Sequence, residues 1–193
     1  MVQLSLFSAD QAEPSPADLA GLLAASGQVV EVGGVARVSA VVADDWRADA
    51  LAEMIVESGL DPQRGRSEEG SPVVGVAQTP ALAEIAAAWT RGAVKVVPAG
   101  WVPGSRAVRV WALAAGKADG DCYLLGLDPH CPDSYAPLAT AMMRTGVAPT
   151  LVGTRGARPA LRVTGHRRLV RLAEMVGAPP LGALAAEAWP YPF

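Results

Sequence analysis

The 193-residue sequence has few aromatic residues, two cysteines, two lysines and no long hydrophobic run. Ala and Val supply most of its 51% hydrophobic content, and charged residues or prolines interrupt every apolar stretch. None approaches the roughly 20 apolar residues that a bilayer-spanning helix needs. The first residues also lack a positive segment followed by an apolar one, which a secretory signal would require. We therefore expect a cytoplasmic protein with no membrane partner.

The two cysteines, Cys122 and Cys131, are expected to be free thiols in a reducing compartment. His130 lies beside Cys131, but no second pair of ligands stands at the spacing of a zinc site. The sequence thus predicts no metal and no cofactor.

Charge is distributed unevenly along the chain. Residues 1–90 carry 4 basic and 13 acidic side chains, a net charge of −9, whereas residues 91–193 carry 12 basic and 6 acidic ones, a net charge of +6. The two halves are therefore expected to present opposite electrostatic fields.

The predicted elements follow the same order in both halves, which indicates an internal repeat. The first half reads as a helix, a hairpin turning at Gly33-Gly34, an amphipathic helix, a strand and a helix, at residues 18–27, 28–42, 46–60, 73–77 and 79–89. The second half reads as a helix, a strand, a helix, two paired strands and a helix, at residues 106–116, 122–128, 135–145, 150–154, 160–164 and 167–176. The second half shows no clear first hairpin, and residues 63–71 read as a polar connection.

These patterns divide the chain into five parts. We expect a flexible tail at residues 1–14, a first repeat at 15–92, a linker at 93–105, a second repeat at 106–180 and a carboxyl-terminal tail at 181–193. The last tail ends in the aromatic sequence from Trp189 to Phe193, which we expect to lie across the domain surface.

Small residues dominate the helix that opens the first repeat. It reads Leu19-Ala20-Gly21-Leu22-Leu23-Ala24-Ala25-Ser26-Gly27, and a looser counterpart is Leu113-Ala114-Ala115-Gly116-Lys117-Ala118-Asp119-Gly120-Asp121. Gly21 with Ala25, and Ala112 with Gly116, place small residues one turn apart, so that two helix backbones can approach closely.

This first helix resembles the LAGLIDADG motif that names a family of homing endonucleases. Within that family the chain is similar to the WhiA type of sporulation regulator, whose amino-terminal part is a degenerate LAGLIDADG domain. The likeness covers most of residues 15–180, through the helix, the hairpin around residues 32–38, the helix after it and the end of the second repeat. No helix-turn-helix is recognised after it. The resemblance implies an α+β fold of two pseudo-symmetric α/β repeats whose antiparallel sheets form a saddle.

The resemblance also implies a chemistry. Active homing endonucleases place an acidic residue at the carboxyl end of each motif helix, where the pair holds divalent metal for phosphodiester cleavage. The first such position is Ser26, and the second is Asp119 or Gly120, depending on how the motif is aligned. At most one acid remains, so we expect no catalytic residue and no nuclease activity. The Asp-Gly pair at 119–120 is also typical of a turn.

In the family, the saddle lies in the major groove of DNA. The second repeat offers six basic side chains for such a contact: Arg155, Arg158, Arg162, His166, Arg167 and Arg168. The first repeat carries Gly75 where Arg162 stands, and Glu68-Glu69 lie nearby. This predicts a one-sided and salt-sensitive grip on double-stranded DNA. The alternative is that the arginines form a solvated face that pairs partly with the acidic first half.

The sharpest local signal is the pentapeptide Gln3-Leu4-Ser5-Leu6-Phe7. It matches the consensus by which many bacterial replication and repair proteins bind the sliding clamp, the β subunit of the replicase. Leu4, Leu6 and Phe7 can fill apolar pockets in an extended peptide, and the Gln3 amide can both donate and accept. The alternative is a short edge strand, since apolar and polar residues alternate.

The sequence therefore favours a non-catalytic accessory protein of DNA replication or repair, associated with the nucleoid and bound to the sliding clamp. We expect a monomer, because a pseudo-twofold interface is already internal to the chain. Two alternatives stay open. One is a clamp-recruited, metal-dependent endonuclease that uses Asp119. The other is a WhiA-like DNA-binding transcriptional regulator in which the pentapeptide match is accidental.

Overall fold

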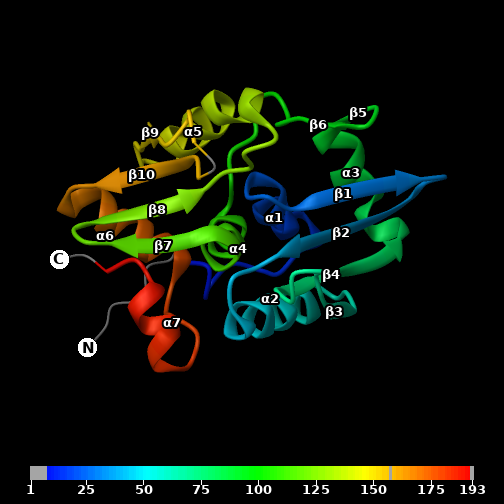
Figure 1. Ribbon diagram of the computed structural model, residues 1–193, viewed down its shortest axis with the longest axis horizontal. Coiled ribbons are helices and arrows are strands. Elements are labelled where there is room, and N and C mark those ends of the chain that lie inside the picture. The colour runs from blue at the N-terminus through cyan, green and yellow to red at the C-terminus, as the bar shows by residue number, and fades with distance from the viewer. Residues whose placement is uncertain (1–7, 157, 192–193) are drawn as a thin grey trace.

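Two four-stranded antiparallel sheets lie side by side, with helices packed on one face of each (Figure 1). The computed structural model describes residues 8–156 and 158–191. The strand orders are β1-β2-β4-β3 in the first sheet and β7-β8-β10-β9 in the second, so the two sheets have the same topology. This arrangement confirms the predicted α+β fold of two pseudo-symmetric repeats.

The first repeat opens with a short 3₁₀ turn, Pro16–Leu19, that continues into helix α1, Ala20–Ala24. A hairpin and a helix follow, β1 (Gln28–Val32), β2 (Val35–Val41) and α2 (Asp45–Glu57). The repeat then adds β3 (Pro62–Arg66), β4 (Pro72–Thr79) and α3 (Ala83–Trp89), and a two-stranded ribbon comes next, β5 (Thr90–Arg91) with β6 (Val94–Lys95). Gly33 and Gly34 form the hairpin turn with φ of 62° and 82°, conformations that glycine adopts without strain.

The second repeat runs through the same sequence of elements. It contains α4 (Ser105–Ala115), β7 (Gly116–Asp119), β8 (Cys122–Gly126), α5 (Tyr135–Arg144), β9 (Thr150–Val152), β10 (Ala160–Thr164) and α6 (His166–Val176). Helix α7 (Ala183–Ala188) follows it and lies against β7. The ends of α2 and α5 show how closely the repeats correspond. Ser58 and Thr145 follow these helices, and each is followed by a glycine with positive φ, at positions 59 and 146.

A close helix–helix contact joins the two repeats. Helices α1 and α4 cross at the centre of the molecule, between the sheets (Figure 1). A Cβ atom at Gly21 would collide with the carbonyl oxygen of Ala107 and would lie 2.8 Å from the backbone nitrogen of Trp111. The close approach predicted at Gly21 is therefore confirmed. The second predicted small pair is wrong, because Gly116 lies in β7, outside the helix, and packs against the Tyr123 hydroxyl.

Two strands contradict the sequence interpretation. Residues 62–66, read in part as a polar connection, form edge strand β3, which pairs with β4. Residues 116–119, read as the end of a motif helix, form β7, so the second repeat does have a first hairpin, turning at Gly120. Edge strands with mostly exposed side chains lack the alternating apolar pattern that reveals a half-buried strand.

Both ends of the described chain dock on the second repeat. Ser8 and Ala9 are buried, and the Ala9 amide donates to the Met175 carbonyl at 2.8 Å. Trp189 is also buried and donates from its indole nitrogen to Gly177 at 2.8 Å. The expectation of a flexible tail therefore fails at Ser8 and Ala9, and the described part of the carboxyl-terminal tail lies against the domain through Trp189. In the described part of the chain, none of the helices has the length and apolarity to cross a membrane.

Candidate functional site

Each sheet leaves one face free of helices, and we call this side its open face. Alternation along β2 and β10 defines it, since Val38 and Val163 are buried among the helices while Arg37 and Arg162 are exposed.

The open face of the second sheet carries two cations in one row. The register places four residues side by side across its strands, Lys117, Leu124, Arg162 and Thr150. Lys117 and Arg162 are exposed and lie two strands apart, which corresponds to roughly 10 Å between their backbones. That spacing lets two charged side chains reach neighbouring phosphates of one nucleic-acid strand. Asp119 adds an acid at the far end of β7.

The matching row of the first sheet is uncharged. It consists of Gln28, Ser39, Gly75 and Gln63. Gly75 therefore does occupy the place of Arg162, as the repeat predicted. Among the strand residues of this face, Arg37 is the one cation, and three valines, Val30, Val32 and Val41, are exposed.

The six basic residues predicted to contact DNA fall into three places. Arg162 lies on the open face, and Arg155 and Arg158 are exposed in the turn between β9 and β10. His166, Arg167 and Arg168 form the first turn of α6, a helix that packs against α4 on the covered side of the sheet. The structure does not place these last three on the open face. Sequence reasoning missed Lys117 because its strand was read as helix.

Register also identifies the two helix-end positions at which the sequence resemblance implied acids. Gln28 in β1 and Lys117 in β7 occupy equivalent positions. Ser26 lies two residues before Gln28 and Ala115 lies two residues before Lys117, so Ser26 corresponds to Ala115. The alignment that placed Asp119 or Gly120 at this position is therefore wrong. Asp119 pairs with Cys122 next to the hairpin turn, away from the helix end. Neither helix end carries an acid of its own.

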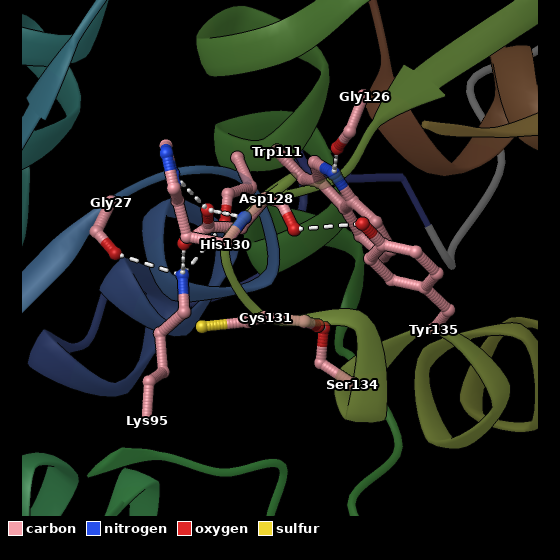
Figure 2. Close-up of polar contacts among 10 residues, drawn as sticks. Gly27, Lys95, Trp111, Gly126, Asp128, His130, Cys131, Ser134 and Tyr135 are labelled. Atoms are coloured by element: carbon pink, nitrogen blue, oxygen red, sulfur yellow. Dashed lines mark hydrogen bonds and ion pairs between the residues drawn. The ribbon is translucent and has the colours of Figure 1, made fainter. Parts of the chain in front are cut away.

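A lysine caps the carboxyl end of α1. Lys95 Nζ donates to the carbonyl oxygens of Ala25 and Gly27 at 3.1 and 3.0 Å, and to Asp128 Oδ2 at 2.6 Å (Figure 2). The side chains of Lys95 and Asp128 are each 11% exposed. The ammonium group thus satisfies carbonyls that the helix leaves without internal partners.

An arginine caps the carboxyl end of α4 in the corresponding way. Arg47 donates to the carbonyl oxygens of Ala112, Leu113 and Gly116 at 3.1, 2.8 and 2.7 Å. Its Nε lies 3.3 Å from Asp44. Asp44 and Asp128 both follow the first hairpin of their repeat, so each repeat supplies an aspartate beside one helix end. Arg47 belongs to the first repeat and caps the helix of the second, which ties the repeats together.

Burial and charge set the ionisation of the groups around these ends. Burial acts to raise the pKa of Asp128, but hydrogen bonds from Lys95 and His130 prevail and hold that pKa below its ordinary value. Burial raises the pKa of the Cys131 thiol, so it is protonated at neutral pH and is not an activated nucleophile. Both cysteines are free thiols, as predicted. The described residues contain no group of three or more His, Cys, Asp or Glu side chains able to hold a metal ion.

The pentapeptide of residues 3–7 lies outside the described residues. Its last residue directly precedes Ser8, where the described part of the chain begins. The clamp contact therefore stays a prediction.

Comparison with protein-family models and with curated proteins finds no match to this sequence. Two solved structures share its fold. A homing endonuclease, I-WcaI, bound to its DNA recognition sequence, superposes with a TM-score of 0.58 at 10% identity, over 91% of this chain and 83% of that one. The amino-terminal LAGLIDADG domain of WhiA superposes with a TM-score of 0.57 at 8% identity, over 86% and 81%. The chain therefore has the LAGLIDADG fold, which confirms the fold that the sequence resemblance implied.

Proposed function

We propose that this protein contacts double-stranded DNA through the open face of its second sheet and does not cut it. The observation that carries the proposal is the row holding Lys117 and Arg162, which presents two exposed cations on a face left free of helices. Arg155 and Arg158 extend the positive surface at the neighbouring turn. Guanidinium and ammonium groups in such positions suit phosphate contacts. The fold supports this reading, because a homing endonuclease bound to DNA shares it.

The grip is one-sided. The equivalent row of the first sheet offers glutamines, a serine and a glycine, and Glu68 and Glu69 are exposed at the β3–β4 turn. Few phosphates are neutralised, so binding is weak, and it falls as salt rises with a slope set by that small number of contacts. A weak grip is sufficient only if something else holds the domain near DNA.

We propose that residues 3–7 supply this tether by binding the sliding clamp of the bacterial replicase. Leu4, Leu6 and Phe7 provide three apolar anchors for an extended peptide, and the amide of Gln3 provides a polar one. Because Ser8 is already buried in the domain, a bound pentapeptide places the domain directly beside the clamp. The tether raises the local concentration of the basic face near DNA, and the protein acts as an accessory of replication or repair.

DNA binding is tested by fluorescence anisotropy on a labelled duplex across a salt series. Lys117→Ala and Arg162→Ala should each weaken binding and flatten the slope of log K against log salt by about 0.9, the loss of one phosphate contact. Arg144→Ala is the matched control, since Arg144 is exposed at the end of α5 on the covered side. Equal effects in the control and in both variants would place the DNA contact elsewhere.

Clamp binding is tested by comparing the wild type with Leu6→Ala/Phe7→Ala in surface plasmon resonance on immobilised clamp. We expect the signal to disappear in the variant. Sequence-specific DNA binding that survives deletion of residues 1–7, with no clamp binding by the wild type, would instead indicate a WhiA-like regulator. The nuclease alternative relied on Asp119 at a helix end, but Asp119 lies in the β7–β8 hairpin.

A further inference from the structure

The helix ends of this chain do not fit the divalent metal that the fold resemblance implies. Such ions are held by several oxygen ligands, carboxylates above all. The two equivalent positions carry Ser26, which is exposed, and Ala115. Loss of the acids alone would leave two clusters of helix carbonyls able to attract a cation from solution.

Those carbonyls are already engaged by side-chain cations. At the α1 end, Lys95 Nζ binds the carbonyls on both sides of Ser26 and also binds Asp128. At the α4 end, Arg47 binds three carbonyls. A divalent ion at either end would compete for the same oxygens and would meet a fixed positive charge within a few ångströms.

We propose that Lys95 and Arg47 are permanent counter-ions that keep the two helix ends closed to divalent metal. The geometry therefore assigns them a role beyond packing: they replace the metal electrostatically, and restoring an acid alone does not restore a metal site. This inference concerns the helix ends and is independent of DNA or clamp binding by the protein.

The test adds an acid at the exposed position and then removes the lysine. Mn²⁺ is titrated into the full-length wild type, Ser26→Asp, Ser26→Asp/Lys95→Met and the uncharged control Ser26→Asn/Lys95→Met, and free Mn²⁺ is read by electron paramagnetic resonance. Far-UV circular dichroism checks that each variant is folded. We expect Ser26→Asp to bind Mn²⁺ within about twofold of the wild type, and Ser26→Asp/Lys95→Met to bind about tenfold more tightly than the uncharged control.

Two results would overturn the proposal. One is a gain of about tenfold or more in Mn²⁺ affinity from Ser26→Asp alone, because the lysine would then not exclude metal. The other is a folded Ser26→Asp/Lys95→Met protein that gains nothing. Ser26 is exposed, so the single variant keeps the proposal falsifiable even where loss of Lys95 prevents folding. Ala115→Asp with and without Arg47→Met repeats the comparison at the α4 end.

Discussion

Replacing Lys95 with methionine should cost this protein a large part of its stability. The change removes three hydrogen bonds, two to helix carbonyls and one to Asp128 at 2.6 Å. It leaves the Asp128 carboxylate buried, in contact with the His130 backbone amide at 2.9 Å and with the His130 ring. Breaking a buried pair by removing one partner costs about 3–5 kcal/mol, and the surviving bonds place this case at the low end of that range.

Urea denaturation followed by circular dichroism measures this cost. The cycle comprises the wild type, Lys95→Met, Asp128→Asn and the double variant. The double variant should lose about 1–2 kcal/mol less stability than the two single variants lose together, because it leaves no unpaired buried charge. The matched control is Arg64→Met, which breaks an ion pair with Asp49 whose side chains are 46% and 54% exposed and should change stability by less than about 1 kcal/mol.

A loss below about 1 kcal/mol for Lys95→Met would refute the reasoning, since it would make the buried cap equivalent to a surface ion pair. Strict additivity in the cycle would refute it as well. Lys95 and Asp128 would then contribute independently, and the lysine would not be the counter-charge of the carboxylate.

Other tests probe the packing at Gly21 and Tyr123 and the ionisation of Asp128. Gly21→Ala should destabilise the fold by about 3 kcal/mol or more, because its Cβ would collide with the Ala107 carbonyl, whereas Gly65→Ala, in open space, should change little; thermal unfolding compares the two. Tyr123→Phe should be neutral or stabilising by up to about 1 kcal/mol in urea, since among the described residues the Tyr123 hydroxyl is the one buried side-chain polar atom without a hydrogen-bond partner. Acid should destabilise the wild type more than it destabilises Asp128→Asn. The pKa of Asp128 is lower in the folded protein than its ordinary value of about 3.9, so the ionised carboxylate stabilises the fold above that value, and this stability is lost as pH falls through the folded-state pKa. Urea midpoints of the two proteins, measured below about pH 5, would reveal the difference.

Local pattern predicted the well-buried elements. The alternation in β2 and β10, the apolar face of α2 and the glycine after it, and the small-residue helix containing Gly21 all carry periodic or capping signals that survive in the structure. The correspondence of Gly75 with Arg162 was also readable, because each repeat has a proline at the start of the strand, Pro72 in β4 and Pro159 just before β10.

Other features depend on distant partners and left no local signal. Strand β7 is short and follows an alanine-rich helix without a proline or polar break, so its residues read as helix and Lys117 was missed. Lys95 and Arg47 bind carbonyls that lie between 65 and 70 positions away from them in the chain. A lone lysine or arginine in a sequence says nothing of the carbonyls that it will bind, and the pseudo-symmetry of the two caps became visible only once register fixed which residues are equivalent.

Lysine acetylation measured by mass spectrometry tests the central claim most directly, because the chain has only two lysines. Lys117 is exposed on the open face proposed to contact DNA, and the Lys95 side chain, 11% exposed in its ion pair with Asp128, serves as an internal reference. The account predicts that free protein is acetylated rapidly at Lys117 and slowly at Lys95, and that saturating duplex DNA protects Lys117 while the rate at Lys95 stays unchanged. Acetylation of Lys117 at the same rate with and without bound DNA would contradict it.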